Sequence, residues 1–199
     1  MKSKKESRIH VSFLSITLFL ATLAILPSCT NTKREDTKEV AEEHNEAKFD
    51  NAKEDDAQFL VTAAEINLEE INLGQLAQKN GMIPEVSKLG KMMETEHNKA
   101  LDELKTLAAK KQVTLPSTIT DNGLDANSKL TKKTGKDFDK EYCAMMVDGH
   151  KKAIDKFEKA STSASDQDIR TWAAGMLPTL RMHLDHAITC QKICEKTNS

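Results

Sequence analysis

Four polar residues stand on segments whose apolar residues repeat with helical spacing: Glu70, His97, His150 and His183. Each lies on the apolar stripe of a different predicted helix. A carboxylate or an imidazole is costly to bury without a partner, so four such groups must satisfy one another or a bound ion. Three imidazoles and one carboxylate suit a single zinc, iron, copper or manganese ion. The sequence therefore predicts a metal site, provided that the four segments converge.

Further carboxylates lie near these positions and are predicted to orient a ligand histidine through its second ring nitrogen. They are Glu94, Glu96 and Asp185. A di-iron centre of the ferritin type needs Glu-x-x-His on two helices. Glu94 stands three residues before His97, but Leu180 occupies the corresponding place before His183. The pattern thus favours one ion over an oxo-bridged pair.

The same four residues have an alternative interpretation without a metal. A histidine on an apolar face is usually a core residue whose nitrogens are hydrogen-bonded, and a satisfied polar network can specify how helices pack. In that arrangement Glu70 accepts from His97, while His150 and His183 pair through water. The protein would then be a non-catalytic structural or interaction module. Neither interpretation requires turnover, so the sequence leaves enzymatic activity undecided.

Helical periodicity predicts an all-α domain without strands. The expected helices cover residues 55–80, 84–111, 137–160 and 166–195. Gly81 and Pro84 mark a short turn between the first two, and a Ser/Thr-rich turn separates the last two. Residues 112–136 contain Pro and Gly and form a long crossover, with a short helix at 124–133. The prediction is two antiparallel hairpins joined by one crossover.

In an antiparallel hairpin, two residues that are equally distant from the turn, one on each helix, lie at the same height along the helices. In the second hairpin this relation pairs His150 with His183 and Cys143 with Cys190. In the first hairpin it pairs Glu70 with His97. Burial of the apolar stripes would then bring all four site residues to about one level.

Four segments resemble the DUF4142 family: Glu70–Ala77, Met93–His97, His150–Ile154 and Leu177–Leu184. The resemblance covers about residues 55–195. It implies a ferritin-like four-helix bundle, common in bacterial envelope proteins and without a firmly established activity. By this likeness Glu70, His97, His150 and His183 correspond to recurrent polar positions of the family.

The first 29 residues predict that the protein is exported to the cell envelope. A basic start precedes an apolar stretch from Ile9 to Leu26, and Pro27-Ser28-Cys29 resembles the lipobox of a bacterial lipoprotein. We expect residues 1–28 to be a signal peptide, with lipid on Cys29 anchoring the protein to a membrane. A signal anchor or an ordinary signal peptide is the alternative. Thr30, rather than Asp, follows Cys29 and favours the outer over the inner membrane.

Composition defines the remaining segments. Residues 29–54 are rich in charge and poor in large apolar groups, so they predict a disordered tether, and residues 55–199 form the domain. Without the signal peptide the chain has 25 basic and 30 acidic residues. It has no basic stripe with interleaved aromatic residues, which makes nucleic acid an improbable partner.

Three cysteines remain besides Cys29. Cys143 and Cys190 lie level in the second hairpin, and an oxidising envelope would allow a disulfide between them. Cys143 with Cys194 is the rival pair. Buried free thiols are another alternative. A copper site of Met145, Met146 and Cys190 is less favoured, because methionine stripes usually belong to the core.

Overall fold

The computed structural model describes residues 35–196, and this range contains six helices and no strand. In chain order they are α1 (Thr37–Glu46), α2 (Asn51–Asn80), α3 (Pro84–Lys111), α4 (Asp121–Thr131), α5 (Gly135–Ser163) and α6 (Gln167–Lys196). None of these helices has both the length and the apolar composition needed to cross a membrane. The predicted signal peptide and Cys29 lie outside the described residues.

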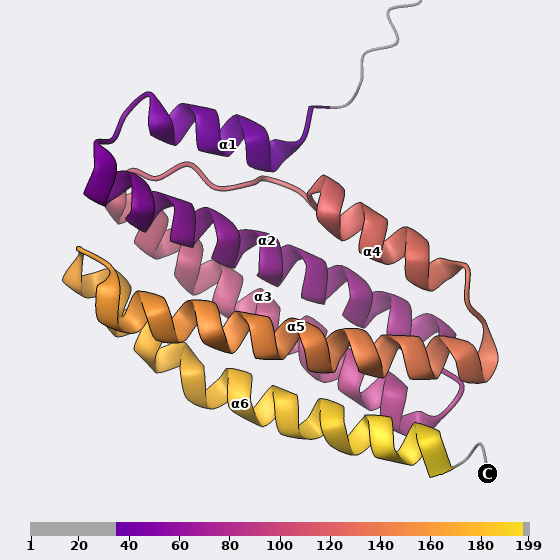
Figure 1. The fold of residues 1–199 in the computed structure, drawn as a ribbon. Coiled ribbons are helices and arrows are strands. Elements are labelled where there is room, and N and C mark those ends of the chain that lie inside the picture. Colours follow the sequence, from indigo (N-terminus) through magenta and orange to yellow (C-terminus); the bar gives the residue numbers. More distant parts are fainter. Residues whose placement is uncertain (1–34, 197–199) are drawn as a thin grey trace, which may run out of the picture. The chain divides into compact units, whose positions relative to one another are not determined.

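The four long helices form two hairpins (Figure 1). Helix α2 ends at Asn80, and Pro84 opens α3 at its first turn, where a missing N–H costs nothing. Helix α5 is followed by α6 after a similarly short connection. Each helix packs most extensively on its hairpin partner. The all-helical prediction is confirmed, and its two hairpins have helix bounds within a few residues of those expected.

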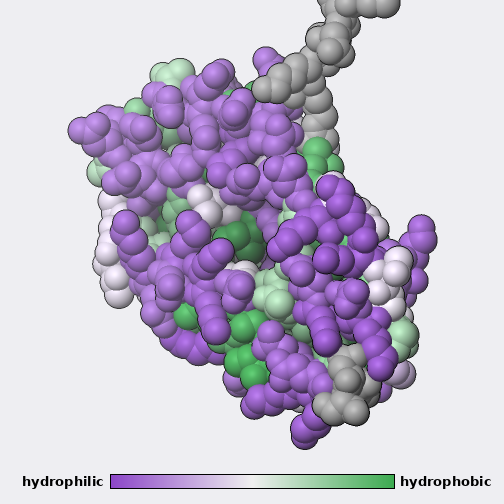
Figure 2. All heavy atoms as spheres, turned by 45° about the vertical axis from the view of Figure 1, so that its right-hand side comes forward, coloured by the Kyte–Doolittle hydropathy of each residue, from purple (hydrophilic) through white to green (hydrophobic). Residues whose placement is uncertain are grey.

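Two apolar clusters occupy the interior, one toward each end of the long helices. The first includes Leu73, Met93, Phe138, Met146 and Ala187. The second includes Leu60, Leu104, Phe157, Ile169 and Leu180. Between them lies a layer of buried polar side chains, which is the subject of the next section. On the face shown in Figure 2, hydrophilic residues cover most of the surface.

Helices α2 and α3 approach each other closely at two glycines. A Cβ atom added at Gly74 would lie 2.7 Å from the carbonyl oxygen of Gly90, and one added at Gly90 would lie 2.6 Å from that of Gly74. Real Cβ atoms do not come so near to backbone oxygens, so both positions require glycine while the helices keep this contact. The contact fixes the height of α3 along α2.

Helix α1 differs from the predicted tether. Ala41 and Asn45 are buried against the rest of the domain. Asn45 donates to the carbonyl oxygen of Thr114 at 2.9 Å and accepts from its N–H at 2.8 Å. Lys38 forms an ion pair with Glu65 at 2.8 Å. Composition suggested disorder because most side chains are charged, but one small face of the helix suffices for docking, and α2 begins at Asn51 rather than at residue 55.

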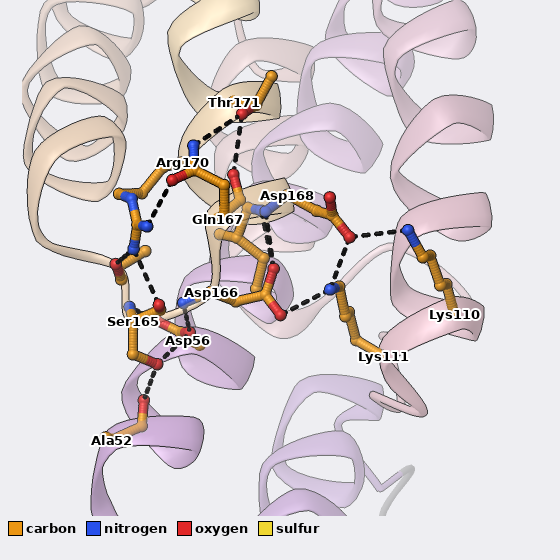
Figure 3. A network of polar contacts seen from close by, with 12 residues as sticks. Ala52, Asp56, Lys110, Lys111, Ser165, Asp166, Gln167, Asp168, Arg170 and Thr171 are labelled. Carbon is orange, nitrogen blue, oxygen red and sulfur yellow. Dashed lines mark hydrogen bonds and ion pairs between the residues drawn. The ribbon is translucent and has the colours of Figure 1, made fainter.

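The turn between α5 and α6 is tied to the first hairpin by a polar network (Figure 3). The buried carboxylate of Asp56 in α2 accepts from the backbone N–H groups of Ser165 and Asp166, both at 2.8 Å. Asp166 in turn forms an ion pair with Lys111 at the end of α3 (2.6 Å) and accepts from the N–H of Asp168. Hydrogen bonds from Lys110 and Lys111 lower the pKa of Asp168 to about 2. This network sets the position at which α6 begins.

Candidate metal centre

Three imidazoles converge in the polar layer: His97 from α3, His150 from α5 and His183 from α6. We call them the histidine cluster. Their exposed fractions are 3%, 1% and 1%. Ring centroids are 5.6 Å apart for His97 and His150, 5.2 Å for His97 and His183, and 5.3 Å for His150 and His183. One ring nitrogen of each lies within 4.8 Å of one nitrogen of each of the others. The layer can therefore present three nitrogen donors to one point.

Asn67 in α2 fixes the ring of His97. Its Oδ1 atom lies 3.0 Å from Nδ1 of His97, and its Nδ2 donates to the carbonyl oxygen of Ala63 at 2.7 Å. Because the amide nitrogen is used as a donor toward Ala63, Oδ1 must accept, and Nδ1 of His97 carries the proton. The lone pair of His97 is therefore on Nε2. A hydrogen bond to the outer nitrogen is the usual way in which proteins orient a metal-binding histidine.

The tautomer of His150 follows from the same reasoning. Its Nδ1 lies 2.8 Å from the carbonyl oxygen of Met146, and because a carbonyl only accepts, Nδ1 carries the proton. Its Nε2 faces Nδ1 of His183 at 3.3 Å. Nε2 of His150 accepts there, which leaves the lone pair of His183 on its own Nε2.

Two of these lone pairs have no partner. Among the described residues, no hydrogen bond reaches Nε2 of His97 or Nε2 of His183, although both atoms are buried. Burial lowers the pKa of all three histidines, and the neighbouring imidazoles reinforce the effect for His97 and His183. For His183 the pKa falls to about 3. The three rings are therefore neutral at neutral pH, which is the form that binds a metal.

Glu70 lies beside the histidine cluster but does not belong to the group of side chains whose ligand atoms come within 4.8 Å of one another. Its Oε1 atom is 3.7 Å from Nδ1 of His150, the outer nitrogen of that ring, and its buried Oε2 has no hydrogen bond to any residue between 35 and 196. Burial, and then the charge of Glu69, raise the pKa of Glu70 well above its ordinary value. The carboxylate has room because Gly149 faces it; a Cβ there would lie 3.1 Å from Oε1.

The carboxylates predicted to orient the histidines do not do so. Glu94 accepts hydrogen bonds from Gln75, Gln78 and Lys91 at the surface. Asp185 is exposed and Glu96 half-buried, and no hydrogen bond of the described residues joins any of the three to an imidazole. The orienting acceptors are Asn67 and a backbone carbonyl instead.

Sequence reasoning also missed two buried polar side chains. Asn67 stands one turn before Glu70 on the same stripe, which is the signal that could have revealed it. Tyr142 in α5 is fully buried, and its hydroxyl has no hydrogen-bond partner in the described part of the chain. Burial, followed by the charges of Glu70, Cys143 and Cys190, raises its pKa well above the ordinary value. Tyr142 is therefore near enough to Glu70 and to the cysteines for their charges to act on it.

The cysteines of the second hairpin meet as their spacing predicts. The Sγ atoms of Cys143 and Cys190 are 2.9 Å apart, and those of Cys143 and Cys194 are 3.7 Å apart. All three are buried and none forms a disulfide in the structure, so the predicted partners are adjacent without a bond between them.

A cavity of about 550 Å³ opens next to Glu70. It extends between α2 and α5, and its lining includes Glu65, Glu69, Asp148, Gly149 and Lys152. Small ions can thus approach the polar layer from the side on which Glu70 lies.

Comparison with known proteins gives one family and one solved structure. The family model described as "Domain of unknown function (DUF4142)" matches residues 38–189, from α1 into α6. The solved structure is described as "CopM in the Cu(II)-bound form". It has a TM-score of 0.57 and 17% sequence identity, and the match covers 69% of this chain and 95% of that chain. At this identity the likeness is one of fold. No curated protein matches the chain.

Proposed function

This chain belongs to the DUF4142 family, and we propose that its domain is a ferritin-like four-helix bundle that binds one divalent transition metal ion in the histidine cluster. The likeness to CopM supports the fold. The cluster lies where the stripes of α3, α5 and α6 meet, and bundles commonly build metal sites from side chains on facing helices.

One observation carries this proposal: the buried Nε2 atoms of His97 and His183 lack a partner within residues 35–196, while hydrogen bonds hold the outer nitrogens of His97 and His150. Buried polar atoms are nearly always paired, and each exception needs an explanation. An ion at the meeting point would accept the lone pairs of His97 and His183, and that of His150 once its hydrogen bond with His183 opens. At a metal–nitrogen distance of about 2.1 Å, tetrahedral ligands lie about 3.4 Å apart, so the rings need to close only slightly.

Imidazole ligands suit copper, zinc and iron, and divalent affinities generally peak at copper. We place Cu(II) first among the candidates, ahead of zinc, iron and manganese, because the similar fold of CopM was solved in a Cu(II)-bound form. Glu70 would either supply a fourth ligand after a side-chain rotation or stabilise His150 through the outer nitrogen Nδ1 of its ring. A dication would also supply the positive charge that a buried carboxylate lacks.

We further propose that the protein works in the bacterial cell envelope, as a metal-handling or protective module. The lipobox-like end at Cys29 supports attachment by lipid, and Thr30 supports the outer membrane.

A specific observation also supports the second candidate, a structural module that binds no metal. His150 and His183 bond to each other directly at 3.3 Å, and Asn67 satisfies one nitrogen of His97. Such a network would specify the packing of the helices without an ion.

Metal analysis of the mature protein, purified without a histidine tag, separates the two candidates. We expect one equivalent of bound metal, or one equivalent of Cu(II) taken up in a calorimetric titration. His97→Ala and His183→Ala should each abolish it. His186→Ala is the matched control, since His186 is exposed on the same helix. If the protein binds neither Cu(II) nor Zn(II), and neither ion changes its melting temperature, the result supports the structural module.

A further inference from the structure

We infer that Cys143, Cys190 and Cys194 form a second, separate metal site, which binds one monovalent copper ion through three sulfur atoms. We call these residues the cysteine cluster. The inference rests on their own geometry and does not depend on metal binding by the histidine cluster.

The three sulfur atoms already surround a common point. Cys190 and Cys194 stand four residues apart and so occupy one face of α6, and Cys143 faces them from α5. Their Sγ atoms lie within 4.8 Å of one another, with distances from Cys143 of 2.9 Å to Cys190 and 3.7 Å to Cys194. Three sulfurs around a central ion, each about 2.3 Å from it, lie about 4 Å apart. Shifts of about 1 Å therefore suffice to form the site.

The surroundings of the cysteine cluster favour a soft ion in a low coordination number. The three residues are at most 3% exposed and belong to the apolar cluster that contains Phe138 and Ala187. Zinc sites built for structure normally have four ligands, whereas this metal-ligating group, within residues 35–196, consists of three thiols. The nearby carboxylate of Asp139 is occupied, since it accepts from the N–H groups of Met82 and Ile83 at 2.9 and 3.0 Å. Thiolate ligands select Cu(I) among the transition ions.

Charge around the cluster is suited to a cation. Asp139 and Glu85 lie near enough to Cys190 for their negative charges to act on it, and these charges favour a cation at the cluster. Each thiol that ligates the ion releases its proton to solvent, and no electron is transferred.

The cysteine cluster is distinct from the histidine cluster. Seven residues separate Cys143 from His150 along α5 and His183 from Cys190 along α6, a rise of about 10 Å. The imidazoles thus offer a site of borderline ligand softness and the thiols a site of soft ligands, at different heights of α5 and α6.

The test uses the mature chain, reduced and kept without oxygen. The chain used begins at Thr30 and therefore lacks Cys29. A thiol assay on this chain after unfolding should count three thiols. Titration of Cu(I) against a chromophoric Cu(I) chelator should show one ion retained per chain at the cysteines, with an ultraviolet thiolate-to-copper charge-transfer band. In the same protein, bound Cu(I) should protect all three thiols from alkylation, a readout that needs no variant.

Variants assign the ion to its ligands. Cys194→Ser and Cys143→Ser should each lose the band and the retained ion while keeping the helical circular dichroism of the parent. The double variant His97→Ala, His183→Ala should keep both, which separates this inference from the function proposed above. The inference is overturned if Cys194→Ser binds Cu(I) as the parent does, if Zn(II) but not Cu(I) protects the thiols, or if added copper leaves Cys143 and Cys190 joined as a disulfide without a retained ion.

Discussion

Asn67 and His97 lie at the same height of the first hairpin, with Oδ1 of one 3.0 Å from Nδ1 of the other. The pair joins α2 to α3 inside the polar layer and turns the lone pair of His97 toward His150 and His183. Since Asn67 is itself held by the carbonyl oxygen of Ala63, the orientation of the imidazole is determined by the backbone of α2.

Replacing Asn67 by Ala should therefore weaken metal binding without removing a ligand. The ring of His97 would lose the acceptor that fixes its tautomer and angle, and loss of such a partner typically costs 10- to 100-fold in affinity, as an order of magnitude. Calorimetric titration with Cu(II) measures the effect. Asn67→Asp retains an acceptor at the same place and should recover most of the affinity. Asn98→Ala, at an exposed position of α3, should leave the affinity unchanged.

The metal-free protein should lose stability as the pH falls below about 6.5, the ordinary pKa of histidine. Burial lowers the pKa of His97, His150 and His183 in the folded state. The unfolded chain then binds more protons than the folded chain, so the free energy of unfolding is greatest above this pH and decreases as the pH falls toward the folded-state values, about 3 for His183. Each histidine contributes a slope of about 1.4 kcal/mol per pH unit in this window.

Urea unfolding at a series of pH values measures this slope, which is proportional to the number of protons taken up on unfolding. His183→Asn should reduce that number by about one. Glu70 acts with the opposite sign, because its pKa is raised and its contribution is lost as the pH rises. Glu70→Gln should consequently steepen the net acid sensitivity. A stability that stays constant between neutral pH and about pH 5 would contradict the burial of neutral imidazoles.

Gly90→Ala should destabilise the domain, since the new methyl group would meet the carbonyl oxygen of Gly74 and the Cβ of Ala77. Overpacking of this kind costs about 1–3 kcal/mol. The matched control is Gly175→Ala in α6, where an added Cβ meets nothing within 4 Å. That change should instead stabilise the domain by roughly 0.5–1 kcal/mol, because alanine is the better helix former. Thermal unfolding of the two variants should thus shift in opposite directions from the parent.

Asp56→Ala should loosen the start of α6. The variant leaves the N–H groups of Ser165 and Asp166 without their acceptor, at a net cost of about 0.5–1.5 kcal/mol for each hydrogen bond lost. Asp55→Ala is the control, since this neighbour is exposed. Hydrogen exchange of the first turn of α6 should accelerate in the first variant only. Equal exchange in both variants would show that the network in Figure 3 does not hold this turn.

Local periodicity explains why most of the fold could be predicted. The bounds expected for α3 agree with the structure at both ends, because Pro84 and the end of the apolar stripe are local signals. The docking of helix α1 could not be found in this way, because it depends on Ala41 and Asn45 meeting α2 and the crossover, which are distant in sequence. The charged composition of this segment points to disorder.

The second hairpin was paired correctly and the first was not. Pairs equally distant from the turn identified His150 with His183 and Cys143 with Cys190, and both pairs are in contact. The same rule paired Glu70 with His97, whereas Asn67 is the partner. The offset of one turn follows from the close contact of Gly74 with Gly90, which sets how the helices slide past each other and leaves no periodic signal.

Local sequence patterns were sufficient to predict the four long helices, their hairpin connectivity and the three histidines that face the core, because each depends on residues within a few turns of one another. The packed fold was needed to show which nitrogen of each ring points inward, that Glu70 lies behind His150, and that three thiols gather two turns away. These features depend on helix heights and rotations of a few ångströms, which are fixed by close packing between segments far apart along the chain.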